Sequence, residues 1–231
     1  MPLDTQPLTA IVPAAGIGQR FPGFRPKQYL SLGERTVIEQ TLQVLLLQEA
    51  IGHIIVVLHP NDNYFHTLPI ASHLRILTAV GGERRMDSVL HGLQQLPSVG
   101  WVLVHDAVRP CLHPDDLQRL LASREHHLEG AVLATPVRDS LKQAGPQRKI
   151  TSSVLRDALW QALTPQLFPA NLLQNCLQRA VADDIEVTDE ASALTYCGYQ
   201  PTLIPGRGDN IKVTYPEDLI MAACLLTQRE G

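Results

Sequence analysis

The sequence that governs this chain reads Leu8-Thr9-Ala10-Ile11-Val12-Pro13-Ala14-Ala15-Gly16-Ile17-Gly18-Gln19-Arg20, and Pro26-Lys27-Gln28 follows shortly after it. The apolar run Leu8–Val12 has the length and composition of a buried β-strand. The next residues are small, so their backbone N–H groups remain open to an anion. Arg20 and Lys27 add positive charge beside them. Open amides and fixed cations bind phosphate groups, so the first hypothesis is a nucleotide site built on Ala14, Ala15, Gly16 and Gly18.

This loop differs from two common phosphate-binding motifs. A dinucleotide fingerprint requires glycine at position 21, where the chain has Phe21, and no G-K-[ST] ending of a P-loop follows. A Gly-x-Gly turn alone is more often a simple tight connection between a strand and a helix. The spacing of Arg20 and Lys27 favours the nucleotide site over that simpler interpretation.

Composition excludes several classes of protein. The chain has 231 residues, is 45% hydrophobic and carries a net charge of -4, which argues against a nucleic-acid partner. No apolar run reaches the length of a membrane span, and Met1–Gln6 lacks the features of a signal peptide. The four cysteines form no C-x-x-C pair, which is typical of reduced thiols. We therefore expect a cytoplasmic protein without a membrane partner.

Strand and helix patterns alternate along the chain. Continuous apolar strands between amphipathic helices predict an α/β fold with a doubly wound, mostly parallel sheet and helices on both faces, in one domain over residues 1–231. The predicted strands are Leu8–Val12, His53–Leu58, Leu74–Val80, Trp101–His105, Ala131–Pro136 and Pro201–Pro205. The predicted helices include Ala170–Ala182, Asp189–Tyr196 capped by Thr188, and a last helix that begins with a capping box from Thr214 to Glu217.

Three polar segments directly follow predicted strands. They are the glycine-rich loop, Gly81-Gly82-Glu83 and Asp106. In sheets of this kind, ligands bind at the carboxyl ends of the strands. The three segments should therefore line one crevice.

The alternating pattern breaks between Val137 and Leu159, where two short polar strands flank a turn at Gly145-Pro146. This hairpin has too few apolar residues to be stable alone, and an isolated hairpin is marginal in water. It is either an exposed loop or an arm that contacts a second subunit.

Several further motifs resemble one family. They are Gly81–Val89, Val104–Pro110, Ala134–Ser140, Leu163–Gln166, Thr188–Ser192 and Asp209–Thr214. Together with the first loop, they resemble the 2-C-methyl-D-erythritol 4-phosphate cytidylyltransferases, which are nucleotidyltransferases of the non-mevalonate isoprenoid pathway, from about Thr9 to Leu226. Glu83 stands where the family pattern has Asp, Ser140 where it has Thr, and Val108 where it has Ala.

The resemblance implies a reaction and a set of site residues. CMP passes from CTP to 2-C-methyl-D-erythritol 4-phosphate by attack of the substrate phosphate on the α-phosphate of CTP, and pyrophosphate leaves. The implied catalytic residues are Arg20 and Lys27, which stabilise the α-phosphate, and Arg156 and Lys212, which position the attacking group. The implied nucleotide-binding residues are Ala14, Ala15, Gly16, Gly18, Gly82, Glu83, Ser88 and Asp106. The implied grip on the second substrate consists of Arg109, Ser140, Thr164 and Thr188.

The resemblance also implies Mg²⁺ and a homodimer. Mg²⁺ favours one or two carboxylates together with phosphate oxygens, and Asp106 and, more weakly, Asp209 are the candidates. A lone Asp after a strand is more often a cap or turn residue, but the motif around Asp106 favours a functional role, at the metal or at the ribose. The dimer would form through the arm at residues 137–159, which would carry Ser140 and Arg156 into the neighbouring active site.

Three other functions remain open at this point. The first is a cytidylyltransferase for another polyol phosphate, such as ribitol 5-phosphate. The second is a dinucleotide-dependent oxidoreductase, which the missing fingerprint disfavours. The third is an inactive nucleotide-binding module, which the joint presence of so many cations disfavours.

Overall fold

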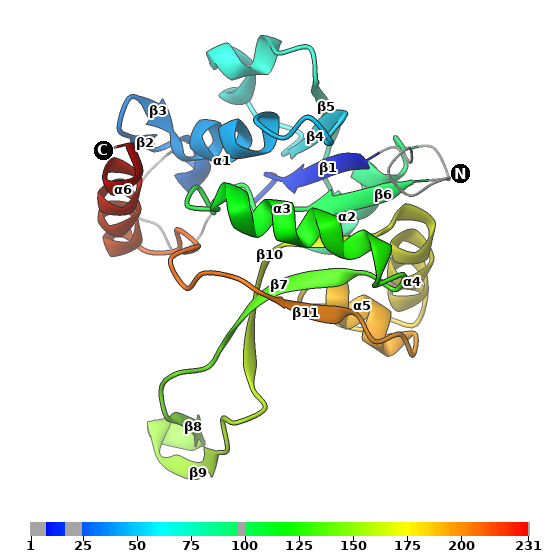
Figure 1. Cartoon of the computed structure of the whole chain (residues 1–231), viewed down its shortest axis with the longest axis vertical. Helices are drawn as coiled ribbons and strands as arrows, with labels where there is room; N and C mark the ends of the chain where they lie inside the picture. Colours follow the sequence, from blue (N-terminus) through cyan, green and yellow to red (C-terminus); the bar gives the residue numbers. More distant parts are fainter. Residues whose placement is uncertain (1–7, 17–24, 97–99, 231) are drawn as a thin grey trace.

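The structure, a computed structural model, describes residues 8–16, 25–96 and 100–230, so the predicted site residues Gly18 and Arg20 lie outside the described part. Within it, a seven-stranded sheet has the strand order β11-β7-β10-β6-β1-β4-β5 (Figure 1). These strands are β1 (Leu8–Pro13), β4 (His53–Leu58), β5 (Ile76–Val80), β6 (Trp101–Val104), β7 (Ala131–Pro136), β10 (Trp160–Pro169) and β11 (Thr202–Pro205).

The sheet is mostly parallel, as predicted. β1 pairs with β4 and β6, β4 with β5, and β7 with β11, all in parallel. The exception is β10, which runs antiparallel between β6 and β7. The sequence did not predict β10, whereas it gave the bounds of β4 and β7 as the structure has them.

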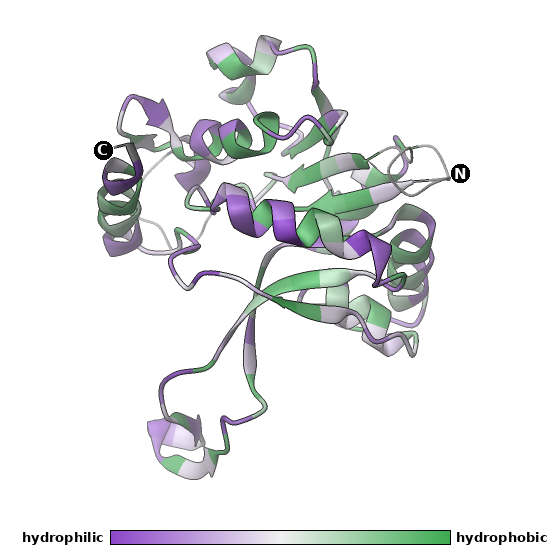
Figure 2. Cartoon of the chain, in the orientation of Figure 1, coloured by the Kyte–Doolittle hydropathy of each residue, from purple (hydrophilic) through white to green (hydrophobic). Residues whose placement is uncertain are grey.

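Helices cover both faces of the sheet, which confirms the doubly wound architecture. α1 (Val37–Leu46) and α3 (Pro114–Ala122) pack on one face, and α2 (Arg85–Leu93), α4 (Ala170–Ala182) and α5 (Glu190–Tyr196) pack on the other. Side chains of a strand alternate between faces, so Ala10 and Val12 join the first cluster and Ile11 joins the second. The strands are accordingly hydrophobic along most of their length (Figure 2).

Two helix starts differ from their predicted caps. Asp189, not Thr188, caps α5, since its Oδ1 accepts a hydrogen bond from the Ser192 amide at 2.9 Å. α6 spans Pro216–Glu230, which is longer than the predicted helix ending at Leu226. The carboxylate of Asp218, rather than that of Glu217, accepts the amides of Thr214 and Tyr215 at 2.8 Å.

The region after β7 forms a hairpin of β8 (Leu141–Ala144) and β9 (Ile150–Val154), which pair antiparallel. It stands away from the body of the molecule on two extended segments that continue β7 and β10 (Figure 1). Its apolar side chains face solvent, with Ile150 68% and Leu155 87% exposed. Among residues 8–16, 25–96 and 100–230, the hairpin therefore buries no core of its own.

The remaining elements are short. They are β2 (Ser31–Leu32), which pairs with β3 (Arg35–Thr36), and the 3-10 turns Lys27–Tyr29, Phe65–Thr67, Pro69–Ser72, Ser123–Glu125 and Pro146–Arg148. In the described part of the chain, no helix combines the length and apolar character needed to cross a bilayer.

Candidate active site

A cleft of about 270 Å³ opens at the carboxyl ends of the parallel strands. The three segments predicted to share a crevice all contribute to it: the loop after β1, the turn after β5 and Asp106 after β6. Nine of the predicted site residues line it, namely Ala14, Ala15, Gly16, Lys27, Gly82, Glu83, Ser88, Asp106 and Lys212.

The loop after β1 is held from two sides. The Ala14 amide donates to the carbonyl of Val57 at 2.8 Å and so extends the pairing of β1 with β4. The side-chain amide of Gln28 then donates to the carbonyls of Ala14 at 2.9 Å and Gly16 at 3.2 Å. Gln28 is buried and was not predicted as a site residue. It ties the Lys27 turn to the glycine-rich loop, which keeps the cation of Lys27 beside the loop amides.

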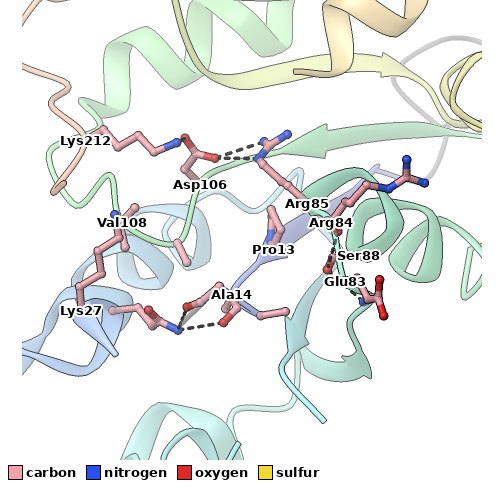
Figure 3. A pocket seen from close by; sticks show the side chains of 15 residues that line it. Pro13, Ala14, Lys27, Glu83, Arg84, Arg85, Ser88, Asp106, Val108 and Lys212 are labelled. Carbon is pink, nitrogen blue, oxygen red and sulfur yellow. Dashed lines mark hydrogen bonds and ion pairs between the residues drawn. The ribbon is translucent and has the colours of Figure 1, made fainter. Parts of the chain in front are cut away.

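The opposite wall comes from the start of α2. The Gly82 amide donates to Ser88 Oγ at 3.2 Å, which folds the turn onto the helix. A Cβ at Gly82 would lie 2.5 Å from the Cβ of Asp87, so a larger residue would force the turn open. Glu83 and Ser88 lie together on this side of the cleft (Figure 3).

Asp106 is the charge centre of the cleft. Its carboxylate lies 2.9 Å from Lys212 Nζ, 3.2 Å from Arg85 and 3.4 Å from Arg109 Nε. Figure 3 shows Lys212 and Arg85 approaching it from opposite sides. Burial alone would raise the pKa of Asp106, but the cations Arg85, Lys212 and Arg109 outweigh burial and hold that pKa well below its usual range. Asp106 is therefore anionic at neutral pH.

A buried hydrogen-bond chain supports Asp106 from behind. His105 Nε2 lies 3.2 Å from the carbonyl of Arg109, which can only accept, so this nitrogen carries the ring proton. His105 Nδ1 then accepts from the Thr164 hydroxyl at 2.9 Å, and that hydroxyl accepts from the Asp106 amide at 3.1 Å. Thr164 was predicted to donate a hydrogen bond to the second substrate, but here its hydroxyl donates to His105. In this arrangement Thr164 positions Asp106 from beneath the cleft.

Four other predicted residues do not line this cleft. Arg109 is buried and donates to the carbonyl of Asn210 at 2.7 Å. Thr188 is exposed, just before α5. Ser140 and Arg156 lie at the base of the hairpin, exposed, and Arg156 contacts the carbonyl of Arg138. The roles of these four residues stay predictions.

Asp209, the second predicted metal ligand, lies elsewhere. Its Oδ2 accepts from Arg229 at 2.9 Å, and it lines a separate hollow with Arg138 and Arg207. The described residues contain no group of three or more His, Cys, Asp or Glu side chains that could hold a metal ion. The chemistry of the donors fits Mg²⁺ only if substrate phosphates supply most of its ligands, with Asp106 as the candidate carboxylate.

Two charged residues of the site were missed by the sequence analysis. Arg85 lies between Asp106 and Glu190, and Glu190 is the first residue of α5. Both lie inside motifs quoted above, Gly81–Val89 and Thr188–Ser192, and this was the available signal. Their separation of 105 positions hides the contact from any local pattern.

The comparisons with known proteins agree with this geometry. The family model described as 2-C-methyl-D-erythritol 4-phosphate cytidylyltransferase (IspD) matches residues 8–228. The chain belongs to this family. A curated relative of that name from Serratia proteamaculans (strain 568) is 55% identical, covering 97% of this chain and 96% of its own. One from Escherichia coli O7:K1 is 51% identical over 95% of this chain and 93% of its own.

Solved structures of the family have the same fold. A crystal structure of a 4-diphosphocytidyl-2C-methyl-D-erythritol synthase has a TM-score of 0.84 at 34% identity. The match covers 96% of this chain and 100% of the other chain. The Francisella tularensis 2-C-methyl-D-erythritol 4-phosphate cytidylyltransferase has a TM-score of 0.82 at 31% identity, over 95% and 99% of the two chains. The family is one of transferases, so the oxidoreductase alternative is wrong.

Proposed function

We propose that this chain transfers CMP from CTP to 2-C-methyl-D-erythritol 4-phosphate, giving 4-diphosphocytidyl-2-C-methyl-D-erythritol and pyrophosphate. The observation that carries the proposal is the cleft itself. It places loop amides and Lys27 on one wall and the ion-paired Asp106 and Lys212 on another, in a member of this family. The relatives are named for the methylerythritol substrate, so ribitol 5-phosphate is not favoured.

The chain's own residues divide the work. An oxygen of the substrate phosphate attacks the α-phosphorus, and the bond from the α-phosphorus to the bridging oxygen breaks as pyrophosphate leaves. Negative charge on the transferred phosphoryl group would be stabilised by Lys27 and the amides of Ala15 and Gly16, with Arg20 as a further candidate. Lys212, held by Asp106, would orient the attacking phosphate.

Base recognition belongs to the α2 side of the cleft. Cytosine presents an amino donor beside a ring carbonyl. Glu83 and Gly82 line this side and supply a carboxylate and a carbonyl as acceptors, and Ala14 lines the facing wall, where its carbonyl already accepts from Gln28. Ser88 helps to shape the turn that presents Gly82 and Glu83.

Mg²⁺ belongs to the proposal as well. The ion would neutralise charge on the triphosphate, and Asp106 is the residue proposed to hold it or to contact the ribose. Phosphate oxygens and water would complete its coordination.

The proposal includes a homodimer. The exposed hairpin lacks a core in its own chain, and a symmetric dimer would cover it. The arm would then bring Ser140 and Arg156 to the partner's cleft, as the family resemblance implies. A cytoplasmic location rests on the four cysteines, all free thiols in the structure.

The test is an assay of pyrophosphate release. Purified protein with CTP, Mg²⁺ and 2-C-methyl-D-erythritol 4-phosphate should release pyrophosphate, and excess EDTA should abolish the release. Ribitol 5-phosphate at the same concentration should give far less. Release of orthophosphate in place of pyrophosphate, or full activity in EDTA, contradicts this mechanism.

A further inference from the structure

Glu190 is a buried carboxylate that, among the residues the structure describes, pairs with one arginine, Arg85. It is 1% exposed, and both of its oxygens accept from the guanidinium of Arg85: Nη1 lies 2.5 Å from Oε1, and Nη2 lies 3.1 Å from Oε2. Two parallel bonds of this kind fix the orientation of the guanidinium as well as its distance. Glu190 therefore sets where Arg85 points.

Arg85 reaches the cleft from this anchor. Its Nε donates to Asp106 Oδ1 at 3.2 Å, while Lys212 Nζ lies 2.9 Å from Asp106 Oδ2. Charges thus alternate from Glu190 through Arg85 and Asp106 to Lys212. The four residues come from the starts of α5 and α2, the end of β6 and the segment before α6.

The position of Glu190 is itself fixed by its neighbours in the chain. Gln166 of β10 donates to Asp189 Oδ2 at 2.9 Å and accepts from the Ala191 amide at 3.0 Å. These two bonds bracket Glu190 on both sides. Thr188 directly precedes Asp189, so the two hydrogen bonds of Gln166 also link the Thr188 segment to the wall of the cleft.

Removing the charge of Glu190 should change which cation pairs most closely with the Asp106 carboxylate. Arg85 would then have one carboxylate instead of two and would compete with Lys212 for Asp106. A buried ion pair that loses one partner leaves an uncompensated charge, which rearranges to find another. The ammonium of Lys212 would shift from the place where it meets the attacking phosphate.

We infer that Glu190 is a positioning residue for the transfer reaction, acting through Arg85 and Asp106 on the ammonium of Lys212. This inference rests on the proposed function. Glu190 touches no substrate in this role. Its contribution should fall on kcat, because displacement of a reacting group by about 1 Å costs up to about 10²-fold in rate.

The variant to test is Glu190→Gln, which keeps the volume and one acceptor oxygen but removes the charge. We expect kcat to fall by about 10- to 100-fold while KM for CTP changes by less than about threefold. In a Lys212→Ala background, the same substitution should lower kcat by less than about threefold, because its target is absent. Equal losses in the two backgrounds would mean that Glu190 supports only folding, and this overturns the inference.

Asp116→Asn is the matched control. Asp116 is also fully buried, at 0% exposed, and pairs with an arginine, Arg119, but it lies on α3 outside the cleft. It should lose thermal stability while it keeps its kcat. If Glu190→Gln does not fold, Arg85→Lys replaces it, since lysine keeps the charge but cannot bridge both carboxylates, and the same loss of kcat is expected.

Failure of the inference is distinguishable from failure of the proposed function. Wild-type protein that releases no pyrophosphate refutes the function. Active wild-type protein whose folded Glu190→Gln or Arg85→Lys variant keeps its full kcat refutes the role of Glu190 alone.

Discussion

The side-chain amide of Gln28 donates a hydrogen bond to the carbonyl oxygen of Ala14, 2.9 Å away, and so ties the turn at Lys27 to the loop after β1. Gln28→Glu keeps the shape but replaces the donor with a carboxylate, which repels the carbonyls of Ala14 and Gly16. We expect KM for CTP to rise at least about tenfold, since a lost buried hydrogen bond and its repulsion exceed about 1.4 kcal/mol. Gln40→Glu is the matched control, because Gln40 donates to the Leu32 carbonyl outside the cleft. Equal KM values for wild type and Gln28→Glu would refute this role.

Lys27 should act on the transition state more than on substrate binding. We expect Lys27→Ala to fold normally and to lose at least about 10²-fold in kcat, with a smaller change in KM for CTP. Arg35→Ala, which removes an exposed cation outside the cleft, should keep the wild-type kcat. A Lys27→Ala enzyme within a few-fold of wild type would exclude the assignment.

Glu83 should select the base by accepting a hydrogen bond from the amino group of cytosine. CTP should remain preferred over UTP in the wild type, and Glu83→Asp should retain that preference. Glu83→Gln can also donate to the carbonyl of uracil, so the ratio of kcat/KM values for the two nucleotides should fall by about tenfold. Comparable kcat/KM values for CTP and UTP in the wild type would show that Glu83 does not select the base.

His105 makes stability depend on pH. Burial lowers the pKa of His105 from 6.5 to about 4, so between these values the unfolded chain binds a proton that the folded chain does not. The free energy of unfolding should therefore fall by about 3 kcal/mol as the pH drops through this window, and it should not change from this cause above pH 6.5. Urea unfolding at several pH values measures the slope, which should be shallower in His105→Gln. Parallel slopes for the two proteins would rule out His105 as the source.

Arg156 should act on the partner's active site if the hairpin is a dimer arm. Arg156→Ala and Lys27→Ala homodimers should each be nearly inactive. A mixed dimer would have one site with both defects and one with neither, so activity should recover toward half of the wild-type value. Lys27→Ala mixed with a differently tagged copy of itself is the control and should show no recovery. A monomer by light scattering, or no recovery after verified subunit exchange, would place Arg156 in its own site or in none.

The sheet was predictable because its parallel strands are continuous apolar runs, such as His53–Leu58, and the parallel arrangement then placed the cleft. β10 was missed because its sequence contains Thr164, Pro165 and Gln166, which are not typical of a central strand. Thr164 and Gln166 are nevertheless buried, because each has a hydrogen-bond partner there: Thr164 bonds to His105, and Gln166 bonds to Asp189. Residues selected for such contacts do not show the hydrophobic pattern from which strands are predicted.

The site was predictable where its residues lie within one motif and unpredictable where they meet across the chain. Asp106 follows the end of β6 and Ala14 follows the end of β1, so the parallel topology brings them together at the cleft. The contact of Arg85 with Glu190 depends on how α2 and α5 pack, and no spacing rule contains that information. Thr188 looked like a helix cap because Asp189, the true cap, is its neighbour and has the same capability.

β10 runs without a break from the hairpin to its pairing with β6, the strand that precedes Asp106. β10 pairs with β7 at Trp160–Ala162 and again from Gln166, where it also pairs with β6, and Thr164 lies at the irregularity in the pairing with β7. A displacement of the hairpin would therefore move β10, and with it Thr164, which accepts a hydrogen bond from the Asp106 amide. Lengthening, shortening or displacing the hairpin would thus change the position of Asp106 in the cleft. Changes in the hairpin would then alter turnover in its own chain's cleft through β10, so the hairpin's shape and the chain's own catalysis would be coupled.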